Sequence, residues 1–290
     1  MMVEHNSRRL RPNPPSPTQE DLSLELPARA TASDCLVIVT ARNEAERIGA
    51  TLAALALAFP GATLFLADDG SADATAAIAR AAGARVVRSE RVGKGAAATA
   101  AATAALREAD ALAGGPVGAG GAGGAGGTGS GTHTGAAPAA VAPGEPGEPI
   151  FVLCDGDLAD SAGELGALAA TVRRGEADVA VAAFARRVGG GIGLAVGFAR
   201  WAIVRRCGLR MTSPISGQRA LRARTLRAVL PFAHGFGMEL GMTIDAVRAG
   251  YRLVEVELPL SHRASGRTPA GFIHRARQLA DFARAFLARR

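Results

Sequence analysis

The chain has 290 residues, of which 48% are hydrophobic and 20% are charged, and its formal net charge at pH 7 is +7. This composition excludes a chain that is disordered throughout and predicts a globular protein with a sizeable core. No apolar run reaches the roughly 20 residues that a membrane-spanning helix needs, and the polar N-terminus has no secretory signal, so we expect a cytoplasmic protein.

The positive charge comes almost entirely from arginine, because Lys94 is the only lysine in the sequence. An excess of basic residues favours phosphate-bearing ligands or an anionic membrane surface. With one Trp, one Tyr and no recognisable nucleic-acid-binding module, nucleic acid is not an expected partner. The three cysteines are odd in number and widely scattered, which predicts buried free thiols in a reducing compartment.

Residues 1–33 are rich in Pro, Ser and Arg, and we expect them to form a disordered tail. From residue 34 onward, apolar strand-like runs alternate with helical patterns, which predicts a mostly parallel sheet flanked by helices. One domain is expected over residues 34–268, followed by an amphipathic C-terminal helix. Strands are expected at residues 35–39, 63–67, 85–88, 150–153, 178–184, 216–221 and 251–260, and helices at residues 48–59, 74–82, 93–111, 162–174, 237–249 and 269–290.

A low-complexity segment interrupts this domain at residues 114–148, where the composition collapses into Gly, Ala, Pro, Thr and Ser. Such a segment cannot bury enough apolar surface to order itself, so we interpret it as a flexible insertion. His133 within it is not expected to take part in chemistry.

Two carboxylates, Asp155 and Asp157, follow the apolar run at residues 150–153. A buried parallel strand would place them at its carboxyl end, where ligands bind in open α/β sheets. Hard carboxylate oxygens suit Mg²⁺ or Mn²⁺, which take their remaining ligands from water and substrate phosphates. The alternative is an ordinary acidic turn in which Asp157 or Asp160 caps the following helix.

Lys94 stands between two glycines at the predicted start of a helix. A compact ammonium in that position can approach an anion closely, with backbone N–H groups assisting. The alternative is a solvated lysine at a helix start. In a similar way, the basic apolar segment at residues 194–204 is either an amphipathic helix on a membrane surface or a core helix with solvated arginines.

Six motifs occur in the order that is typical of glycosyltransferase family 2, at residues 40–44, 68–75, 93–95, 155–157, 216–219 and 262–263. The chain resembles this family over residues 35–283, outside the insertion, and is most similar to the branch that transfers sugars to polyprenyl and dolichyl phosphates. The resemblance implies the type A glycosyltransferase fold, a Rossmann-like α/β fold with a mixed, mostly parallel sheet. It also implies a nucleoside-diphosphate-sugar donor and a divalent cation, Mg²⁺ or Mn²⁺.

The resemblance further implies roles for individual residues. Asp155 and Asp157 would hold the metal, which would act as a Lewis acid for the departing nucleotide. Arginines of the matched motifs would contact phosphates through their guanidinium forks. The residues expected to bind the nucleotide sugar are Thr40, Arg42, Asn43, Glu44, Asp68, Asp69, Ser71, Lys94, Asp155, Gly156, Arg219 and Arg267.

Catalytic roles are expected for Asp157, Glu239, His262 and Arg263. A hydroxyl acceptor requires a general base, for which Glu239 and Asp245 are the candidates. A phosphate acceptor is already ionised and needs only positioning by arginines. The polyprenyl-phosphate branch commonly has Asp where His262 stands, and the pair His262 and Arg263 is similar to transferases such as glucosyl-3-phosphoglycerate synthases.

We therefore predict a metal-dependent, inverting transferase that moves a hexosyl group to a phosphate-bearing acceptor, such as a polyprenyl phosphate. Peripheral contact with the anionic inner face of the cell membrane would accompany that acceptor. Two alternatives stay open. One is a soluble transferase acting on a small phosphorylated acid such as phosphoglycerate, or on a hydroxyl; the other is a non-catalytic scaffold that binds a nucleotide sugar.

Overall fold

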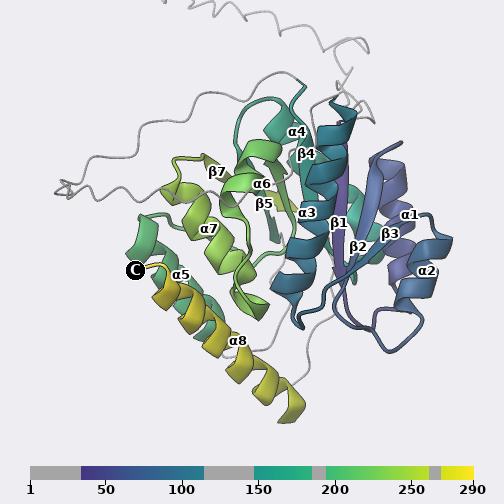
Figure 1. Cartoon of the computed structure of the whole chain (residues 1–290). Helices are drawn as coiled ribbons and strands as arrows, with labels where there is room; N and C mark the ends of the chain where they lie inside the picture. The colour runs from purple at the N-terminus through teal and green to yellow at the C-terminus, as the bar shows by residue number, and fades with distance from the viewer. Residues whose placement is uncertain (1–33, 114–146, 185–193, 261–268) are drawn as a thin grey trace, which may run out of the picture.

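The computed structural model of the chain describes residues 34–113, 147–184, 194–260 and 269–290 (Figure 1). The predicted tail at residues 1–33 and nearly all of the predicted insertion at 114–148 lie outside the described residues. The same holds for His262, Arg263 and Arg267, so the roles predicted for these three side chains stay predictions.

The described strands form one mixed sheet in the order β3-β2-β1-β4-β6-β5-β7. Only β6 runs antiparallel to its neighbours, β4 and β5, and the other pairs are parallel. The predicted mixed, mostly parallel α/β sheet is therefore confirmed. The strands are β1 (Cys35–Ala41), β2 (Thr63–Asp68), β3 (Arg85–Arg88), β4 (Ile150–Asp155), β5 (Val179–Phe184), β6 (Arg219–Arg222) and β7 (Leu253–Leu258).

Helices cover both faces of the sheet, as Figure 1 shows. One face packs against α1 (Ile48–Ala58), α2 (Thr75–Ala81), the 3₁₀ helix η1 (Ala159–Leu165) and α4 (Gly166–Arg173). The opposite face packs against α3 (Lys94–Leu112), α5 (Leu194–Cys207), α6 (Ala223–Val229), the 3₁₀ helix η2 (Gly235–Gly237), α7 (Met238–Arg248) and α8 (Pro269–Ala288).

The alternation of side chains along β1 explains why both faces are apolar. Leu36 and Ile38 point into the core under α3, whereas Val37 and Val39 point into the core under α1. A strand buried on both sides needs a continuous apolar run, which is the pattern that predicted it. The buried face of α3 consists mainly of alanines, and their small side chains let this helix lie close to the sheet.

The strand register sets the position of the functional residues. Thr40 of β1 lies beside Asp155 of β4, and Ala41 lies beside Asp68 of β2. Because all three strands are parallel, their carboxyl ends meet at one edge of the sheet. The three motifs that follow these strands are therefore brought together by the sheet itself.

Several predicted elements differ in detail from the structure, among them the strand expected at residues 216–221, which spans Arg219–Arg222 as β6. The helix expected at residues 162–174 is split into η1 and α4. The basic apolar segment forms α5, which packs against α7 and α8 and buries Ala199, Ala202 and Ile203, while Trp201 stays half-exposed. Within the described ranges, no helix is long and apolar enough to cross a membrane.

Candidate functional site

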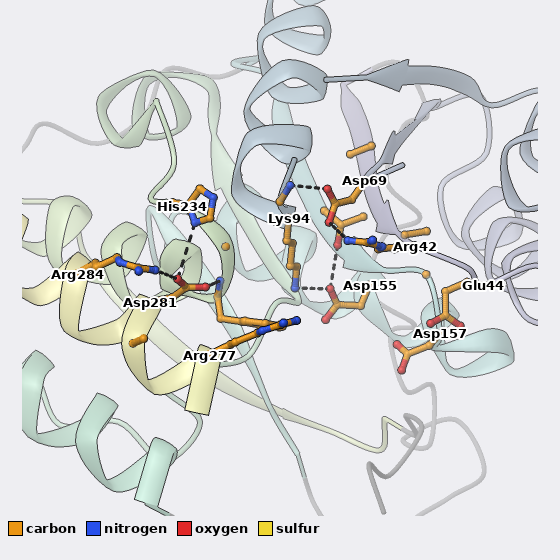
Figure 2. A pocket seen from close by; sticks show the side chains of 18 residues that line it. Arg42, Glu44, Asp69, Lys94, Asp155, Asp157, His234, Arg277, Asp281 and Arg284 are labelled. Carbon is orange, nitrogen blue, oxygen red and sulfur yellow. Dashed lines mark hydrogen bonds and ion pairs between the residues drawn. The ribbon is translucent and has the colours of Figure 1, made fainter. Parts of the chain in front are cut away.

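A pocket of about 900 Å³ opens at the carboxyl ends of β1, β2 and β4 (Figure 2). This volume is in the range of small-molecule sites. Strand ends and the start of α3 form one wall, and η2 with α8 forms the other. Its lining residues are Thr40, Ala41, Arg42, Glu44, Ala67, Asp69, Gly93, Lys94, Asp155, Gly156, Asp157, His234, Gly235, Phe236, Arg277, Ala280, Asp281 and Arg284.

Asp155 lies at the centre of the strand wall and is held by three side chains. Its Oδ1 atom is 2.6 Å from Lys94 Nζ and accepts a 3.0 Å hydrogen bond from Thr40 Oγ1. Its Oδ2 atom accepts a 2.8 Å hydrogen bond from Gln218 Nε2. Burial favours the neutral acid, but Lys94 and these hydrogen bonds outweigh it and hold the pKa of Asp155 below its ordinary value.

The motif at residues 216–219 supports Asp155 instead of contacting a phosphate. A Cβ atom at Gly217 would lie 2.6 Å from Asp155 Oδ2, so only glycine permits this approach. Arg219, which we predicted to bind the nucleotide sugar, is fully buried and does not line the pocket. Its Nε donates to the Ser216 carbonyl and its Nη1 to Thr243 Oγ1. Burial lowers the pKa of Arg219 to about 10.

Backbone contacts hold the turn that carries Asp157. The Gly156 N–H donates to the Thr40 carbonyl at 2.9 Å, and Thr51 Oγ1 donates to the Gly156 carbonyl at 2.9 Å. Arg47 Nη1 donates to the Asp157 carbonyl at 3.2 Å. The alternative capping role does not apply, because the N-terminus of η1 has no side-chain cap. The turn therefore presents the half-buried Asp157 side chain to the pocket.

Lys94 joins the strand wall to α7. Its Nζ atom lies 2.6 Å from Asp155 and 2.7 Å from Glu239 Oε1. Burial disfavours the ammonium, but the two carboxylates outweigh it and raise the pKa of Lys94 above its ordinary value. The alternative of a solvated lysine is therefore wrong: Lys94 is an ion-paired residue that keeps about a quarter of its side chain exposed.

Neither predicted general base is available at the pocket surface. The Glu239 side chain is only 5% exposed, is paired with Lys94 and does not line the pocket. Asp245 forms an ion pair with Arg289, near the end of the chain, and does not line the pocket either. In the structure Glu239 supports Lys94, and the catalytic role predicted for Glu239 stays a prediction.

The glycines on both sides of Lys94 have a packing role. A Cβ atom at Gly95 would lie 2.0 Å from the Ala233 carbonyl oxygen, and one at Gly93 would lie 3.3 Å from His234 Nε2. The start of α3 can therefore approach η2 only because both residues lack side chains. Gly93 also has φ at +122°, a conformation that favours glycine.

The two carboxylates of the motif after β2, Asp68 and Asp69, lie in different environments. Asp69 lines the pocket, accepts a 2.6 Å hydrogen bond from the Gly93 N–H and lies 3.7 Å from Arg42 Nη1. Asp68, which we predicted to contact the ligand, is buried and does not line the pocket. Burial favours its neutral form, yet hydrogen bonds from Ser71 and the ion pair with Arg88 hold the pKa of Asp68 below its ordinary value.

Asn43 and Ser71 tie two loops together and do not line the pocket. The Asn43 N–H donates to Ser71 Oγ at 3.1 Å, and Asn43 Oδ1 accepts a 2.8 Å hydrogen bond from the Ala72 N–H. Asn43 adopts φ of +57°, which this amide tolerates better than most side chains. These hydrogen bonds join the loops that follow β1 and β2, and the predicted contacts of Asn43 and Ser71 with the nucleotide sugar stay predictions.

The donor set at the strand wall fits a divalent cation of the Mg²⁺ or Mn²⁺ class. Asp155 and Asp157 offer carboxylate oxygens at one edge of the pocket. Within the described part of the chain, no group of three or more His, Cys, Asp or Glu residues could hold a metal. Two carboxylates suit a cation that takes further ligands from phosphates and water.

The second wall was not foreseen from the sequence. It brings His234, Arg277, Asp281 and Arg284 into the pocket, opposite Asp155 and Lys94 (Figure 2). The sequence signal for this wall was a glycine on each side of Phe236. Such glycines indicate that the backbone lies close to another segment, but they do not identify that segment. The predicted site residues that do line the pocket are Thr40, Arg42, Glu44, Asp69, Lys94, Asp155, Gly156 and Asp157.

Comparisons with known proteins agree with this geometry. The family model for Glycosyl transferase family 2 matches residues 36–109, which confirms the resemblance predicted from the motifs. The matched segment contains nearly all of β1, then β2, β3 and most of α3, and so includes the strand wall except for Asp155, Gly156 and Asp157. No curated protein matches the sequence significantly.

Solved structures of glucosyl-3-phosphoglycerate synthase from Mycobacterium tuberculosis share the fold. The complex with phosphoglyceric acid is 24% identical, with a TM-score of 0.60, over 88% of this chain and 79% of that one. The complex with Mn²⁺, UDP and glucosyl-3-phosphoglycerate is 23% identical, with a TM-score of 0.59, over 95% and 86%. The complex with Mg²⁺ and UDP is 22% identical, with a TM-score of 0.60, over 94% and 84%.

Proposed function

We propose that this chain, which carries a family 2 glycosyl transferase segment at residues 36–109, transfers a hexosyl group from a nucleoside-diphosphate sugar to a small phosphate-bearing acceptor. The observation that carries the proposal is the arrangement of Asp155, Asp157 and Lys94 at one edge of the pocket. Carboxylates for a cation and an ammonium for anions meet there at the carboxyl ends of parallel strands, where nucleotides bind in open α/β sheets.

The donor lies, in this proposal, along the strand wall. Arg42, Glu44 and Asp69 line the part that follows β1 and β2 and face the nucleoside. Asp155 and Asp157 would hold Mg²⁺ or Mn²⁺, which would supply Lewis-acid stabilisation of negative charge on the diphosphate. Lys94 lies next to the same phosphates and offsets part of the negative charge of Asp155 and Glu239. Transfer with inversion at the sugar carbon stays part of the proposal.

Among the acceptors that the sequence left open, a polyprenyl phosphate, a small phosphorylated acid and a hydroxyl, the structural relatives favour the small phosphorylated acid. Solved relatives that share the fold bind phosphoglyceric acid or glucosyl-3-phosphoglycerate together with Mn²⁺ and UDP or UDP-glucose. The polyprenyl-phosphate acceptor, with its peripheral membrane contact, is therefore the weaker hypothesis. A cytoplasmic location stays a prediction. Retention of the protein on vesicles of anionic lipid, but not of neutral lipid, would restore the lipid-linked acceptor to first place.

The test of the proposal is donor binding by the purified full chain. Titration with UDP-, GDP- and ADP-sugars in the presence of Mn²⁺, Mg²⁺ or a chelator should reveal one donor whose affinity depends on the metal. Asp157→Asn should lose that metal dependence, whereas Asp160→Asn, an exposed carboxylate outside the pocket lining, should keep it. Absence of binding to every donor would remove the proposal.

Turnover separates the enzyme from the non-catalytic scaffold. The full chain with the selected donor, the metal and phosphoglyceric acid should release the free nucleoside diphosphate and form a glycosylated acid detectable by mass spectrometry. Donor binding without release of the nucleoside diphosphate, with phosphoglyceric acid, glycerol 3-phosphate or water as acceptor, would favour the scaffold.

A further inference from the structure

The wall of the pocket that faces the strand ends is built from two segments far apart in the sequence. The segment at residues 234–236 precedes α7, and Arg277, Asp281 and Arg284 belong to α8. The three α8 residues follow one another at spacings of four and three residues, which places them on one face of the helix. Figure 2 shows this face turned into the pocket.

Asp281 fixes the geometry of this wall. It is buried and accepts hydrogen bonds from the Phe236 N–H at 3.1 Å and from Arg284 Nη1 at 2.9 Å. The ring nitrogen Nδ1 of His234 lies 3.8 Å from Asp281 Oδ1. Gly235 has φ at +55°, and a Cβ atom there would lie 2.1 Å from Asp281 Oδ2. The loop and the helix are thus locked together before any ligand binds.

Arg277 differs from the other cations that line the pocket. Arg42 lies near Asp69, Lys94 is bound by Asp155, and Arg284 is bound by Asp281.

Among the residues that the structure describes, none pairs with the guanidinium of Arg277, which is exposed. In Figure 2 it reaches from α8 into the pocket on the side of Lys94 and Asp155. The wall formed by residues 234–236 and α8, here called the helical wall, therefore presents a positive charge that no described carboxylate neutralises.

We propose that Arg277 and Arg284, with the ring of His234, form the subsite that binds the anionic group of the acceptor, a phosphate or a carboxylate. This inference rests on the proposed function, because it assigns the strand wall to the donor and the opposite wall to the acceptor. A guanidinium fork matches the oxygens of either anion with two parallel hydrogen bonds. A pocket of about 900 Å³ has room for both ligands at once.

An anion subsite on α8 would also orient the acceptor group that receives the sugar. An anion held on α8 leaves the rest of a small acceptor directed toward Asp155 and Lys94, across the pocket. The Asp281 contacts keep Arg284 and His234 in place, so an acceptor is oriented by groups that are already ordered. We assign Asp281 as a positioning residue for this subsite.

Calorimetric titration of the full chain, saturated with Mn²⁺ and UDP, tests the subsite with phosphoglyceric acid, glycerol 3-phosphate and inorganic phosphate as probes. Arg277→Ala should weaken the tightest of these probes about 10- to 100-fold, the range expected when a hydrogen-bonded pair of charges loses one partner. Arg277→Lys should give an intermediate loss, because it keeps the charge but not the fork. Arg107→Ala, which removes an exposed arginine of α3 outside the pocket lining, is the matched control and should leave the affinity unchanged.

The affinity for UDP with Mn²⁺, measured in the same variants, separates the two proposals. Unchanged UDP binding with weakened anion binding in Arg277→Ala supports the subsite. Equal anion affinity in Arg277→Ala and in the unmodified chain would overturn the subsite. Failure of all three probes to bind a chain that binds UDP would overturn it as well. Neither of these outcomes would contradict the proposed function. Failure to bind any nucleotide, in contrast, removes the proposed function and the subsite with it.

Discussion

The two walls of the pocket differ in how their charges are arranged. On the strand wall, Lys94 and Asp155 form one compact group with Glu239 of α7, in which both carboxylates contact the same ammonium. On the helical wall, Asp281 binds Arg284, and Arg277 extends into the pocket. One wall is therefore a preformed network in which carboxylates outnumber cations, and the other carries an excess of positive charge. The following predictions test that difference.

The largest effect is expected from Lys94→Ala. The substitution leaves the buried Glu239 and the adjacent Asp155 without their common cation. Removing one partner of a buried ion pair costs about 3 kcal/mol of the free energy of unfolding. Urea denaturation measures the loss. Adding Glu239→Gln to the variant should restore part of it, and a single-variant loss below about 1 kcal/mol would show that the network is solvated and not buried.

Gly95→Ala tests whether the glycine beside Lys94 serves packing between the walls. In an isolated helix alanine is the better residue, but here its Cβ atom would lie 2.0 Å from the Ala233 carbonyl oxygen. We expect a loss of about 2 kcal/mol in the free energy of unfolding from this overpacking.

Gly166→Ala, at the start of α4, is the control for this prediction. Nothing lies within 4 Å of the added Cβ atom there, and the substitution should be neutral or stabilising by about 0.5 kcal/mol. Equal thermal midpoints for the two variants would contradict the packing role of Gly95.

Asp155→Asn and Asp157→Asn compare two carboxylates of the same motif. Asp155 accepts from Lys94, Thr40 and Gln218, and its loss should cost about 1.5 kcal/mol of stability. Asp157 is half-buried at the pocket surface, and its loss should change stability by less than about 0.5 kcal/mol. Chemical denaturation of both variants measures the difference. A larger loss of stability in Asp157→Asn than in Asp155→Asn would contradict the assignment of Asp155 as the structurally supported carboxylate and Asp157 as the one that faces the ligand.

The smallest effect concerns pH. Because the pKa of folded Asp155 lies below its ordinary value of 3.8, the carboxylate stabilises the fold above that value. This contribution should disappear as the pH falls through the folded pKa. The free energy of unfolding should therefore fall more steeply below about pH 4 in the unmodified chain than in Asp155→Asn. Parallel pH profiles for the two proteins would contradict the depressed pKa.

The sequence alone determined the sheet and the strand wall, because both depend on local patterns. Apolar runs that end in polar turns predicted parallel strands whose carboxyl ends meet, and the register of β1, β2 and β4 places Thr40, Asp69 and Asp155 in one pocket. Short motifs do not say which of their members face the ligand. Asp68 and Arg219 belong to matched motifs, yet both are buried supports.

Only the tertiary structure decided the helical wall and the supporting contacts. Gln218 reaches Asp155 across 63 residues of sequence, and the Phe236 N–H reaches Asp281 across 45. Helical periodicity predicts that α8 exists and is amphipathic, but its packing against η2 decides that Arg277 and Arg284 face the pocket. A contact between distant segments depends on how helices pack over the sheet, and no spacing within either segment records it.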